Sequence, residues 1–500
     1  MRDRLRQLLE RFVPTGSVLH RTVMSGIWAT LTNVSGRLLQ VLMLIVLARV
    51  LTPAQFGLMG IALLMLSISK RFTNIGINAA LIRKADEDVD GYLNTTWLLE
   101  IARGVLIFGV LFLTAPFVAD FFGEPRATNL IRAIGFVPVI AGLRNPAVVY
   151  FEKDLEFHRD FLYNTGGAIA QFVVGVAVAL YSPSVWALVA ASLSRPLVKT
   201  PLSYALHDYR PWPSFDLDAA RELVDFGKWM TGASILYWVG REGDDAFVGW
   251  FLSATALGFY QYAYRLADMP ATEMSQIVSQ VTFPAYSAVQ GDIAALQSAL
   301  LQSTRFVAFL AFPMSFGIAL VAPSFVPVVL GSQWTPMIVT MQLLALYGLC
   351  HAITGNYGEV WKTLDRPDLI LKTSGLRVLV FALFILPATA RWGIEGTAFV
   401  ITATYVFPIL PLDIYLTAKL TELRSLDLYR EYVYPFVGSL TMFGTLWYVR
   451  SLLDVTPLVE LAILVPAGAL VYAAATLLLE SQFEWGIVGN LRMIADEIKG

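Results

Sequence analysis

The clearest indication of the fold class lies in Ser25–Ala62, SGIWATLTNVSGRLLQVLMLIVLARVLTPAQFGLMGIA. An apolar block that begins near Val23 runs to about Val50, and the short turn LTPAQFG leads directly into a second apolar block. A helix needs about 20 apolar residues to cross the hydrocarbon core of a bilayer. The stretch therefore predicts two transmembrane helices joined by a tight turn.

The composition of the whole chain agrees with this prediction. Of 500 residues, 56% are hydrophobic and 15% are charged, whereas a soluble domain has roughly 45–50% apolar and 25% charged residues. The mean hydropathy is +0.62. The single cysteine, Cys350, excludes an internal disulfide and a cysteine-rich metal site. We therefore expect an all-α integral membrane protein.

Apolar blocks of spanning length recur along the chain and predict about fourteen transmembrane helices. They lie near residues 22–50, 54–80, 93–118, 127–149, 161–181, 184–206, 226–252, 257–288, 303–330, 335–361, 369–390, 394–417, 433–452 and 457–479. Lys and Arg gather on alternate loops, as they do on the cytoplasmic side of membrane proteins. Only Arg126, Arg391 and Arg450 fall clearly on the opposite side. We therefore predict a multi-pass protein of the cytoplasmic membrane with both termini cytoplasmic.

The first and seventh predicted helices form an internal repeat that aligns without a gap. Aligning Ser25–Ala62 with Phe226–Ala263 pairs Trp28 with Trp229 and Gly57 with Gly258, and superimposes the short outside turn. Because both copies begin on the predicted cytoplasmic side, they are parallel repeats, as in transporters whose binding site lies at the repeat interface. The predicted segments are an amphipathic N-terminus (1–21), an N-lobe (22–206), a cytoplasmic linker (207–225), a C-lobe (226–417), two further helices (418–480) and a cytoplasmic tail (481–500).

The seventh predicted helix carries an unusual cluster of charges, in YWVGREGDDAFVGWF, Tyr237–Phe251. On a helix, Arg241 and Asp245 are i,i+4 neighbours and Asp244 shares their side. Glu242 lies about 100° round the helix, so we expect its partner on another helix. A charged side chain at the bilayer centre costs at least about 2.5–3.5 kcal/mol and usually faces the bundle interior or a watery cavity. The cluster therefore indicates a polar lumen.

Other predicted spans carry buried charges of the same kind. The cationic candidates for binding a substrate are Arg37, Lys70, Arg71, Arg103, Arg241 and Arg265, and the acidic candidates for binding a coupling ion, Na⁺ or H⁺, are Asp244, Asp245 and Glu100. The alternative is that such residues form salt bridges or snorkel to the membrane surface. That alternative is favoured for Lys199, Arg305 and Lys362, near predicted cytoplasmic ends. For His351, a hydrogen-bonded position between helices is expected.

The sequence contains no signature of a soluble enzyme. It lacks the phosphate-binding pattern GxxxxGK[ST], so ATP hydrolysis is not expected. It has no His, Asp or Glu cluster with the spacing of metal ligands, and no predicted outside loop is long enough to hold a catalytic site. We therefore expect neither a cofactor nor catalysis, and a process driven by an ion gradient, the membrane potential or the substrate's own gradient.

Two segments resemble a known family. LARVLTPAQFGLMGIALLMLSISKRFTNIGINAALIRK and FGKWMTGASILYW, followed by VGWFLSATALGFYQYAYRLADMPATEMSQIVSQVTFPAYSAVQGD, are similar to the polysaccharide transporter branch of the multidrug/oligosaccharidyl-lipid/polysaccharide flippase superfamily. The similarity is greatest to Wzx-like and teichuronic-acid-exporter-like proteins and covers most of the chain. LTPAQFG and ALGFYQYAYRL are its most specific parts.

The resemblance implies two six-helix lobes that form a V-shaped central cavity, two extra C-terminal helices and alternating access. The implied substrate is a polyprenyl-diphosphate-linked oligosaccharide, moved to the outer leaflet for surface polysaccharide or glycoprotein assembly. Membrane lipids and other polysaccharide-assembly proteins are the expected partners, and nucleic acid is not. Two alternatives stay open: a cation-coupled multidrug exporter of the same fold, and a membrane-embedded glycan polymerase or ligase.

Overall fold

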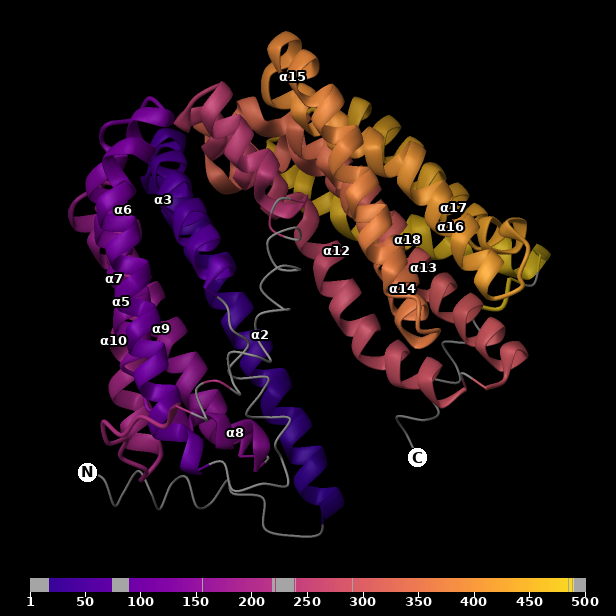
Figure 1. Ribbon diagram of the computed structural model, residues 1–500. Coiled ribbons are helices and arrows are strands. Elements are labelled where there is room, and N and C mark those ends of the chain that lie inside the picture. The colour runs from indigo at the N-terminus through magenta and orange to yellow at the C-terminus, as the bar shows by residue number, and fades with distance from the viewer. Residues whose placement is uncertain are drawn as a thin grey trace. The chain divides into compact units, whose positions relative to one another are not determined.

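The structure is a computed structural model that describes residues 18–73, 90–154, 156–217, 221, 238, 240–289, 291–483, 485–487 and 489. These residues form helices and connecting segments, with no strand among them (Figure 1). The all-α fold class predicted from the sequence is therefore confirmed. Contacts divide the chain into two compact units, Met1–Gly258 (unit 1) and Phe259–Gly500 (unit 2).

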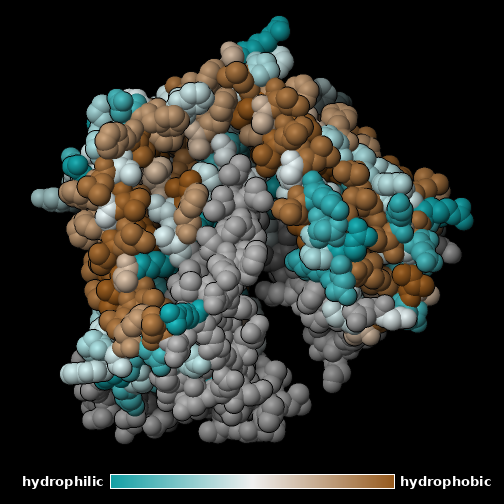
Figure 2. Space-filling view, viewed as in Figure 1, coloured by the Kyte–Doolittle hydropathy of each residue, from teal (hydrophilic) through white to brown (hydrophobic). Residues whose placement is uncertain are grey.

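The helices of unit 1 pack against partners both near and far along the chain. They are α2 (Val18–Val50), α3 (Pro53–Phe72), α5 (Asp90–Phe121), α6 (Ala127–Ile134), α7 (Phe136–Gly142), η1 (Pro146–Val148), α8 (Val149–Lys153), α9 (Phe157–Tyr181) and α10 (Trp186–Leu206). Helix α9 contacts both α2 and α10, α3 contacts α6, and α5 contacts α6 and α7. In Figure 2, hydrophobic residues dominate the visible flank that α5, α6, α7 and α10 occupy in Figure 1.

One predicted helix of unit 1 is not a single rod. The apolar block near 127–149 is bent by 75° between Ala127–Gly142 and Pro146–Lys153. Pro146 has no backbone N–H to continue a helix, and the Asn145 side chain accepts a hydrogen bond from the Ala147 backbone N–H instead. The helix predicted near 127–149 is therefore interrupted at this point, because an Asn-Pro pair starts a new helical turn there.

Unit 2 holds longer helices. They are α12 (Ala254–Ala288, which begins in unit 1), α13 (Ile293–Phe325), η2 (Val326–Leu330), η3 (Ser332–Met337), α14 (Ile338–Thr363), α15 (Asp368–Thr404), η4 (Tyr405–Ile409), α16 (Leu410–Leu420), α17 (Ser425–Leu452) and α18 (Pro457–Phe483). Helix α13 contacts α14, α17 and α18. Helix α15 contains a break at Gly393, with φ 59° and ψ −138°. This break confirms the predicted boundary between the helices near 369–390 and 394–417.

Several helices are long and apolar enough to cross a membrane. In the part of the chain that the structure describes there are eight, or nine if the bent pair at Ala127–Lys153 forms one span. The predicted total of fourteen is not confirmed by this count. One candidate, Asp368–Leu420, contains two of the predicted helices, and part of the predicted seventh helix lies outside the described residues. The chain is a multi-pass membrane protein.

Helices α3 and α12 approach each other closely where both begin. A Cβ added at Gly57 would lie 1.6 Å from the carbonyl oxygen of Ala254, and one added at Gly258 would lie 2.1 Å from that of Pro53. The repeat alignment pairs Gly57 with Gly258 and Pro53 with Ala254. The two contacts are therefore equivalent under the internal repeat, and both depend on glycine.

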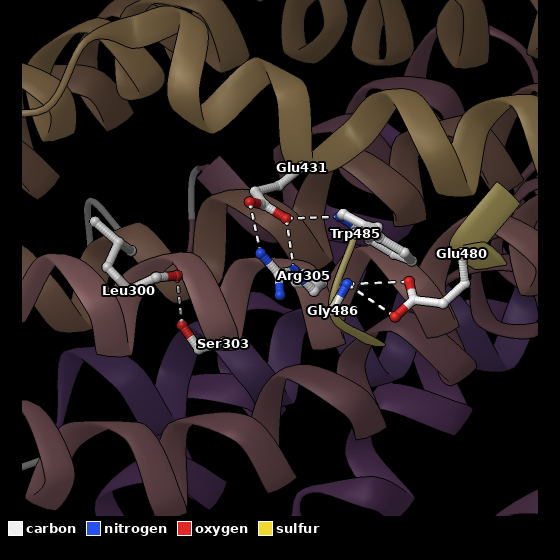
Figure 3. Close-up of polar contacts among 7 residues, drawn as sticks. All are labelled: Leu300, Ser303, Arg305, Glu431, Glu480, Trp485 and Gly486. Carbon is white, nitrogen blue, oxygen red and sulfur yellow. Dashed lines mark hydrogen bonds and ion pairs between the residues drawn. The ribbon is translucent and has the colours of Figure 1, made fainter. Parts of the chain in front are cut away.

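In unit 2, a buried ion pair between α13 and α17 also binds Trp485, which follows α18 (Figure 3). Arg305 of α13 donates to both carboxylate oxygens of Glu431 on α17, from Nε at 2.8 Å and Nη2 at 3.0 Å. Trp485 Nε1 donates to the same carboxylate at 2.8 Å, and the Gly486 backbone N–H donates to Glu480. The expectation that Arg305 forms a salt bridge is confirmed.

Candidate functional site

A cationic pocket lies in unit 1 between the C-terminal half of α3 and the middle of α5. It has a volume of about 460 Å³ and is lined by Leu63, Leu66, Ser67, Lys70, Arg71 and Arg103. The three basic residues of this lining were all predicted as candidates from the sequence. The structure thus brings together Lys70, Arg71 and Arg103, which come from two helices.

Arg103, on α5, also caps the C-terminal end of α3. Its Nε donates to Thr73 Oγ1 at 3.2 Å and its Nη2 donates to the carbonyl oxygen of Lys70 at 3.1 Å. The last carbonyl groups of a helix have no partner within the helix, and a basic side chain there satisfies them and complements the helix dipole. Glu100, one turn earlier on α5, lies 3.9 Å from Arg103 Nη1. These contacts hold the guanidinium beside Lys70 at the pocket.

The Lys70 side chain differs from that of Arg103 in its contacts. It is exposed at the pocket and makes no hydrogen bond or ion pair with the described residues, although its backbone carbonyl accepts from Arg103. An ammonium group in this position has three donors for a ligand. Lys70 is therefore the basic residue of the pocket that can be changed with the least effect on packing.

A second basic group continues the positive field from α3 towards α10. The charge of Arg195 acts on Lys70, and the charges of Arg195 and Arg144 act on Lys199. The Lys199 ammonium donates to Asn164 Oδ1 at 2.7 Å and lies 4.1 Å from the centroid of the Tyr163 ring. With Lys70, Arg71 and Arg103, the basic residues of unit 1 form one neighbourhood, which we call the cationic cluster: Lys70, Arg71, Arg103, Arg144, Arg195 and Lys199.

Helix α9 positions the members of the cationic cluster on α10. A Cβ at Gly167 would lie 2.7 Å from Lys199 Cγ and 3.3 Å from Arg195 Cγ, so both stems pack against the bare backbone of α9. Asn164 holds Lys199 and in turn donates to Asp160 Oδ1 at 2.7 Å. Asp160 and Glu100 are the acidic residues that contact this neighbourhood, so positive charge predominates among the described residues.

Part of this cluster was not predicted from the sequence. Arg144 and Arg195 were not singled out, and Lys199 was assigned to the structural alternative. Arg195 and Lys199 are i,i+4 neighbours on one helix face, and Asp160 and Asn164 have the same spacing. That shared spacing on adjacent predicted helices was the available signal.

The remaining candidates lie elsewhere. Arg37 is half-buried on α2 and does not line the pocket. Arg241 and Asp245 are half-buried, and Asp244 is only 4% exposed, on the helical residues 240–250. Arg265 is exposed on α12 in unit 2. Their predicted roles in binding a substrate or an ion are untested by these positions.

Trp238 links Glu242 of this helical segment to the pocket. Trp238 Nε1 donates to Glu242 Oε2 at 2.9 Å and to Ser67 Oγ at 3.2 Å. Ser67 lines the cationic pocket. The expectation that Glu242 has its partner on another helix was wrong, because the indole nitrogen four residues earlier reaches the carboxylate and the pocket wall together.

Unit 2 contains a separate polar network around His351. His351 Nδ1 lies 2.9 Å from Asp268 Oδ1, and the imidazole stacks on Tyr347. Tyr347 accepts a hydrogen bond from Tyr264 at 2.6 Å, and Arg377 donates to Tyr405, which packs edge-on against Tyr347. The prediction that His351 is a hydrogen-bonded residue between helices is confirmed.

Among the residues that the structure describes, no group of three or more His, Cys, Asp or Glu side chains could hold a metal ion. The pocket lining combines three basic side chains and the Ser67 hydroxyl with the apolar side chains of Leu63 and Leu66. Such a pocket suits an anionic ligand with several oxygen acceptors, because guanidinium groups bind carboxylate and phosphate by paired hydrogen bonds.

The fold defines a class: a multi-pass helical membrane protein. The structure is similar to that of the lipid II flippase MurJ in an inward closed conformation, with a TM-score of 0.72, 12% identity, and coverage of 91% of this chain and 99% of that one. It is also similar to an inward-facing multidrug resistance MATE transporter, with a TM-score of 0.62, 12% identity, and coverage of 80% and 95%.

The sequence matches the family described as "Polysaccharide biosynthesis protein" over residues 46–339, and the chain belongs to this family. It is 25% identical to the lipopolysaccharide biosynthesis protein WzxC of Escherichia coli K12, over 73% of this chain and 74% of that protein. It is 24% identical to the teichuronic acid biosynthesis protein TuaB of Bacillus subtilis 168, over 90% and 94%. A relative described as "Probable low-salt glycan biosynthesis flippase Agl15", of Haloferax volcanii, is 22% identical over 82% of this chain and 79% of that protein. The family resemblance predicted from the sequence is confirmed, and it groups the chain with transporters, not with enzymes.

Proposed function

We propose that the protein is a flippase that moves a polyprenyl-diphosphate-linked oligosaccharide from the cytoplasmic to the outer leaflet of the cytoplasmic membrane. The relatives named for lipopolysaccharide, teichuronic acid and glycan biosynthesis support a lipid-linked glycan as substrate. The proposed orientation places both termini in the cytoplasm, following the distribution of Lys and Arg.

The observation that carries the proposal is the cationic cluster of unit 1. A diphosphate offers several oxygen acceptors and two or more negative charges. Lys70, Arg71 and Arg103 supply cationic donors around one pocket of about 460 Å³, and the charges of Arg195 and Lys199 extend the positive field. Charge-assisted hydrogen bonds of this kind are roughly twice as strong as neutral ones. We propose that the diphosphate binds here while the sugars occupy the lumen.

Transport is proposed to follow alternating access between an N-lobe (22–206) and a C-lobe (226–417), driven by a coupling cation or by the substrate gradient. Asp244 and Asp245 stay the candidates for binding such a cation. Glu100 is the weakest of the three, because it lies 3.9 Å from Arg103, and a carboxylate beside an arginine is a poorer ligand for a cation. Other polysaccharide-assembly proteins are proposed as partners on the strength of the family.

The test replaces Lys70, whose side chain makes no contact that the fold depends on. A Lys70→Gln variant should bind a polyprenyl diphosphate several-fold more weakly in detergent and should flip it more slowly in vesicles, with an unchanged melting temperature. The control is Arg126→Gln, because the Arg126 side chain is 70% exposed and its one ion pair among the described residues is with Glu124. Equal binding by Lys70→Gln and the wild type at low and moderate salt would remove this pocket from the mechanism.

The fold alone suggests a second candidate function. The similarity to a multidrug resistance MATE transporter is compatible with a cation-coupled drug exporter. The basic pocket opposes this function, since a cationic drug would meet like charges. Efflux of ethidium or norfloxacin by cells that produce the protein, abolished by inactive variants, would favour the exporter over the flippase.

A further inference from the structure

Unit 2 contains an apolar groove that the proposed transport cycle does not use. It has a volume of about 490 Å³ and lies between the two legs of the α15 hairpin, continuing into η4. Its lining is apolar except for Arg391 and Thr404, and the Thr404 hydroxyl donates to the carbonyl oxygen of Val400 in its own helix. Arg391 is therefore the charged group of the groove, and Trp392 Nε1 is a further donor. Pockets that bind small ligands have about 300–1,000 Å³.

The geometry of the hairpin explains why the groove exists. Near the Gly393 corner the two legs touch: a Cβ at Gly396 would lie 2.2 Å from the Ala388 carbonyl oxygen, and Thr389 and Thr397 share a hydrogen bond of 2.8 Å. Further from the corner, Pro387 interrupts the first leg, and the π-helical turn Tyr405–Ile409 with Pro408 interrupts the second. Both prolines line the groove. Prolines and π-turns bend helices, so the legs separate there.

The groove opens on the outer surface of unit 2. Phe384, Phe399 and Phe407, which line it, are 57%, 51% and 72% exposed. In a segment apolar enough to span a bilayer, such rings face lipid. Arg391 and the neighbouring Trp392 mark the end of the groove at the predicted membrane interface, where tryptophans are enriched.

Arg391 differs from the other two arginines predicted on this side of the membrane. Arg126 lies 3.3 Å from Glu124, and Arg450 lies 2.7 Å from Glu460. Arg391 stacks over the Trp392 ring at 5.4 Å and forms no ion pair with any residue that the structure describes. Two of the three charges are thus neutralised by carboxylates of the chain, and the third lies beside an apolar groove.

We propose that this groove binds one anionic glycerophospholipid of the bilayer, with an acyl chain between the legs of α15 and the phosphate at Arg391. Arginine binds phosphate through paired hydrogen bonds. A single arginine matches one phosphate. A polyprenyl diphosphate would need more positive charge than this site offers, and the cationic cluster that suits it belongs to unit 1.

The experiment is native mass spectrometry of the delipidated full-length protein, titrated with dioleoylphosphatidylglycerol, dioleoylphosphatidylcholine or undecaprenyl phosphate. The wild type should bind one molecule of phosphatidylglycerol, and should bind it more tightly than phosphatidylcholine or undecaprenyl phosphate. An Arg391→Gln variant should bind it about fivefold more weakly, which corresponds to one arginine–lipid interaction. The matched control Arg126→Gln should bind as the wild type does.

A second variant tests the acyl-chain part of the site. Ala403→Phe fills the groove while keeping Arg391, so it should weaken binding of both phospholipids. Should that variant fail to fold, a photo-crosslinking residue in place of Phe407 tests the same contact, and it should label phospholipid. Unchanged phosphatidylglycerol binding by Arg391→Gln, or displacement of phosphatidylglycerol by a lower concentration of undecaprenyl phosphate, would overturn the proposal. Glycan flipping is measured in a separate assay, so the result of the lipid-binding experiment does not decide whether the protein is a flippase.

Discussion

Replacing Gly57 by alanine should destabilise the protein through the contact between α3 and α12. The new Cβ would lie 1.6 Å from the Ala254 carbonyl oxygen, and real Cβ atoms essentially never approach closer than 3.0 Å, so the two backbones must separate by roughly 1.4 Å. No side chain can rotate away, because the obstacle is backbone. Overpacking costs about 1–3 kcal/mol, and alanine in a helix interior recovers about 0.5–1 kcal/mol over glycine. We expect a net loss of about 1–2 kcal/mol.

The repeat supplies an internal check on this prediction. Gly258→Ala places a Cβ 2.1 Å from the Pro53 carbonyl oxygen, so it should destabilise the protein to a similar or slightly smaller extent. Once one substitution has separated the helices, the second meets less resistance. The double variant should therefore lose less stability than the sum of the two single losses, as expected for neighbouring positions.

The assay is thermal unfolding in detergent, followed by tryptophan fluorescence. The matched control is Gly36→Ala on α2, where an added Cβ would meet nothing within 4 Å, so the melting temperature should rise. The single variants at α3 and α12 should instead melt below the wild type. If Gly57→Ala were stabilised as Gly36→Ala is, the close approach of α3 and α12 would be refuted.

Three further predictions concern other parts of the fold. Glu431→Gln leaves the mostly buried Arg305 without its counter-charge and should cost about 3–5 kcal/mol; an unchanged melting temperature would contradict the buried ion pair. Gly393→Ala, at φ 59° and ψ −138°, should cost about 1–3 kcal/mol, whereas Gly375→Ala in the same helix should not; equal melting temperatures would contradict the strained corner. Burial, and then the charge of Arg159, lower the pKa of His207. The folded state therefore favours the neutral imidazole, and this stabilisation is present above the unfolded pKa of 6.5 and is lost as the pH falls towards the folded pKa. Melting temperatures from pH 8 to pH 5 should fall more steeply in the wild type than in His207→Gln, and parallel curves would contradict this account.

The sequence predicted the helical class and part of the cationic site for clear physical reasons. A charge within an apolar block of spanning length is costly unless it faces a cavity, and this singled out Lys70, Arg71 and Arg103, which the structure places together at one pocket. The Gly57 and Gly258 contact was present in the repeat alignment as a pair of identical residues. That these two glycines allow a close contact between α3 and α12 follows only from the positions of the two backbones.

Other features depend on tertiary contacts that a single sequence does not contain. Arg195 joins the cationic cluster because α9 and α10 pack together, and Arg144, in the turn between α7 and η1, joins it because its charge acts on Lys199. The bend at Asn145 was hidden inside an apolar block. The groove beside Arg391 exists because two helix legs are bent by Pro387 and Pro408, and hydropathy does not record a gap between helices.

The central claim is that the protein moves a complete lipid-linked glycan across the membrane. The most direct test is mass spectrometry of the polyprenyl-linked glycan pool in cells that lack the protein, combined with labelling of the sugars from outside. The account predicts that the complete lipid-linked oligosaccharide accumulates with its sugars inaccessible from outside, and that the wild-type protein reverses this accumulation more effectively than Lys70→Gln. An unchanged pool, or a pool of truncated glycans alone, would contradict it.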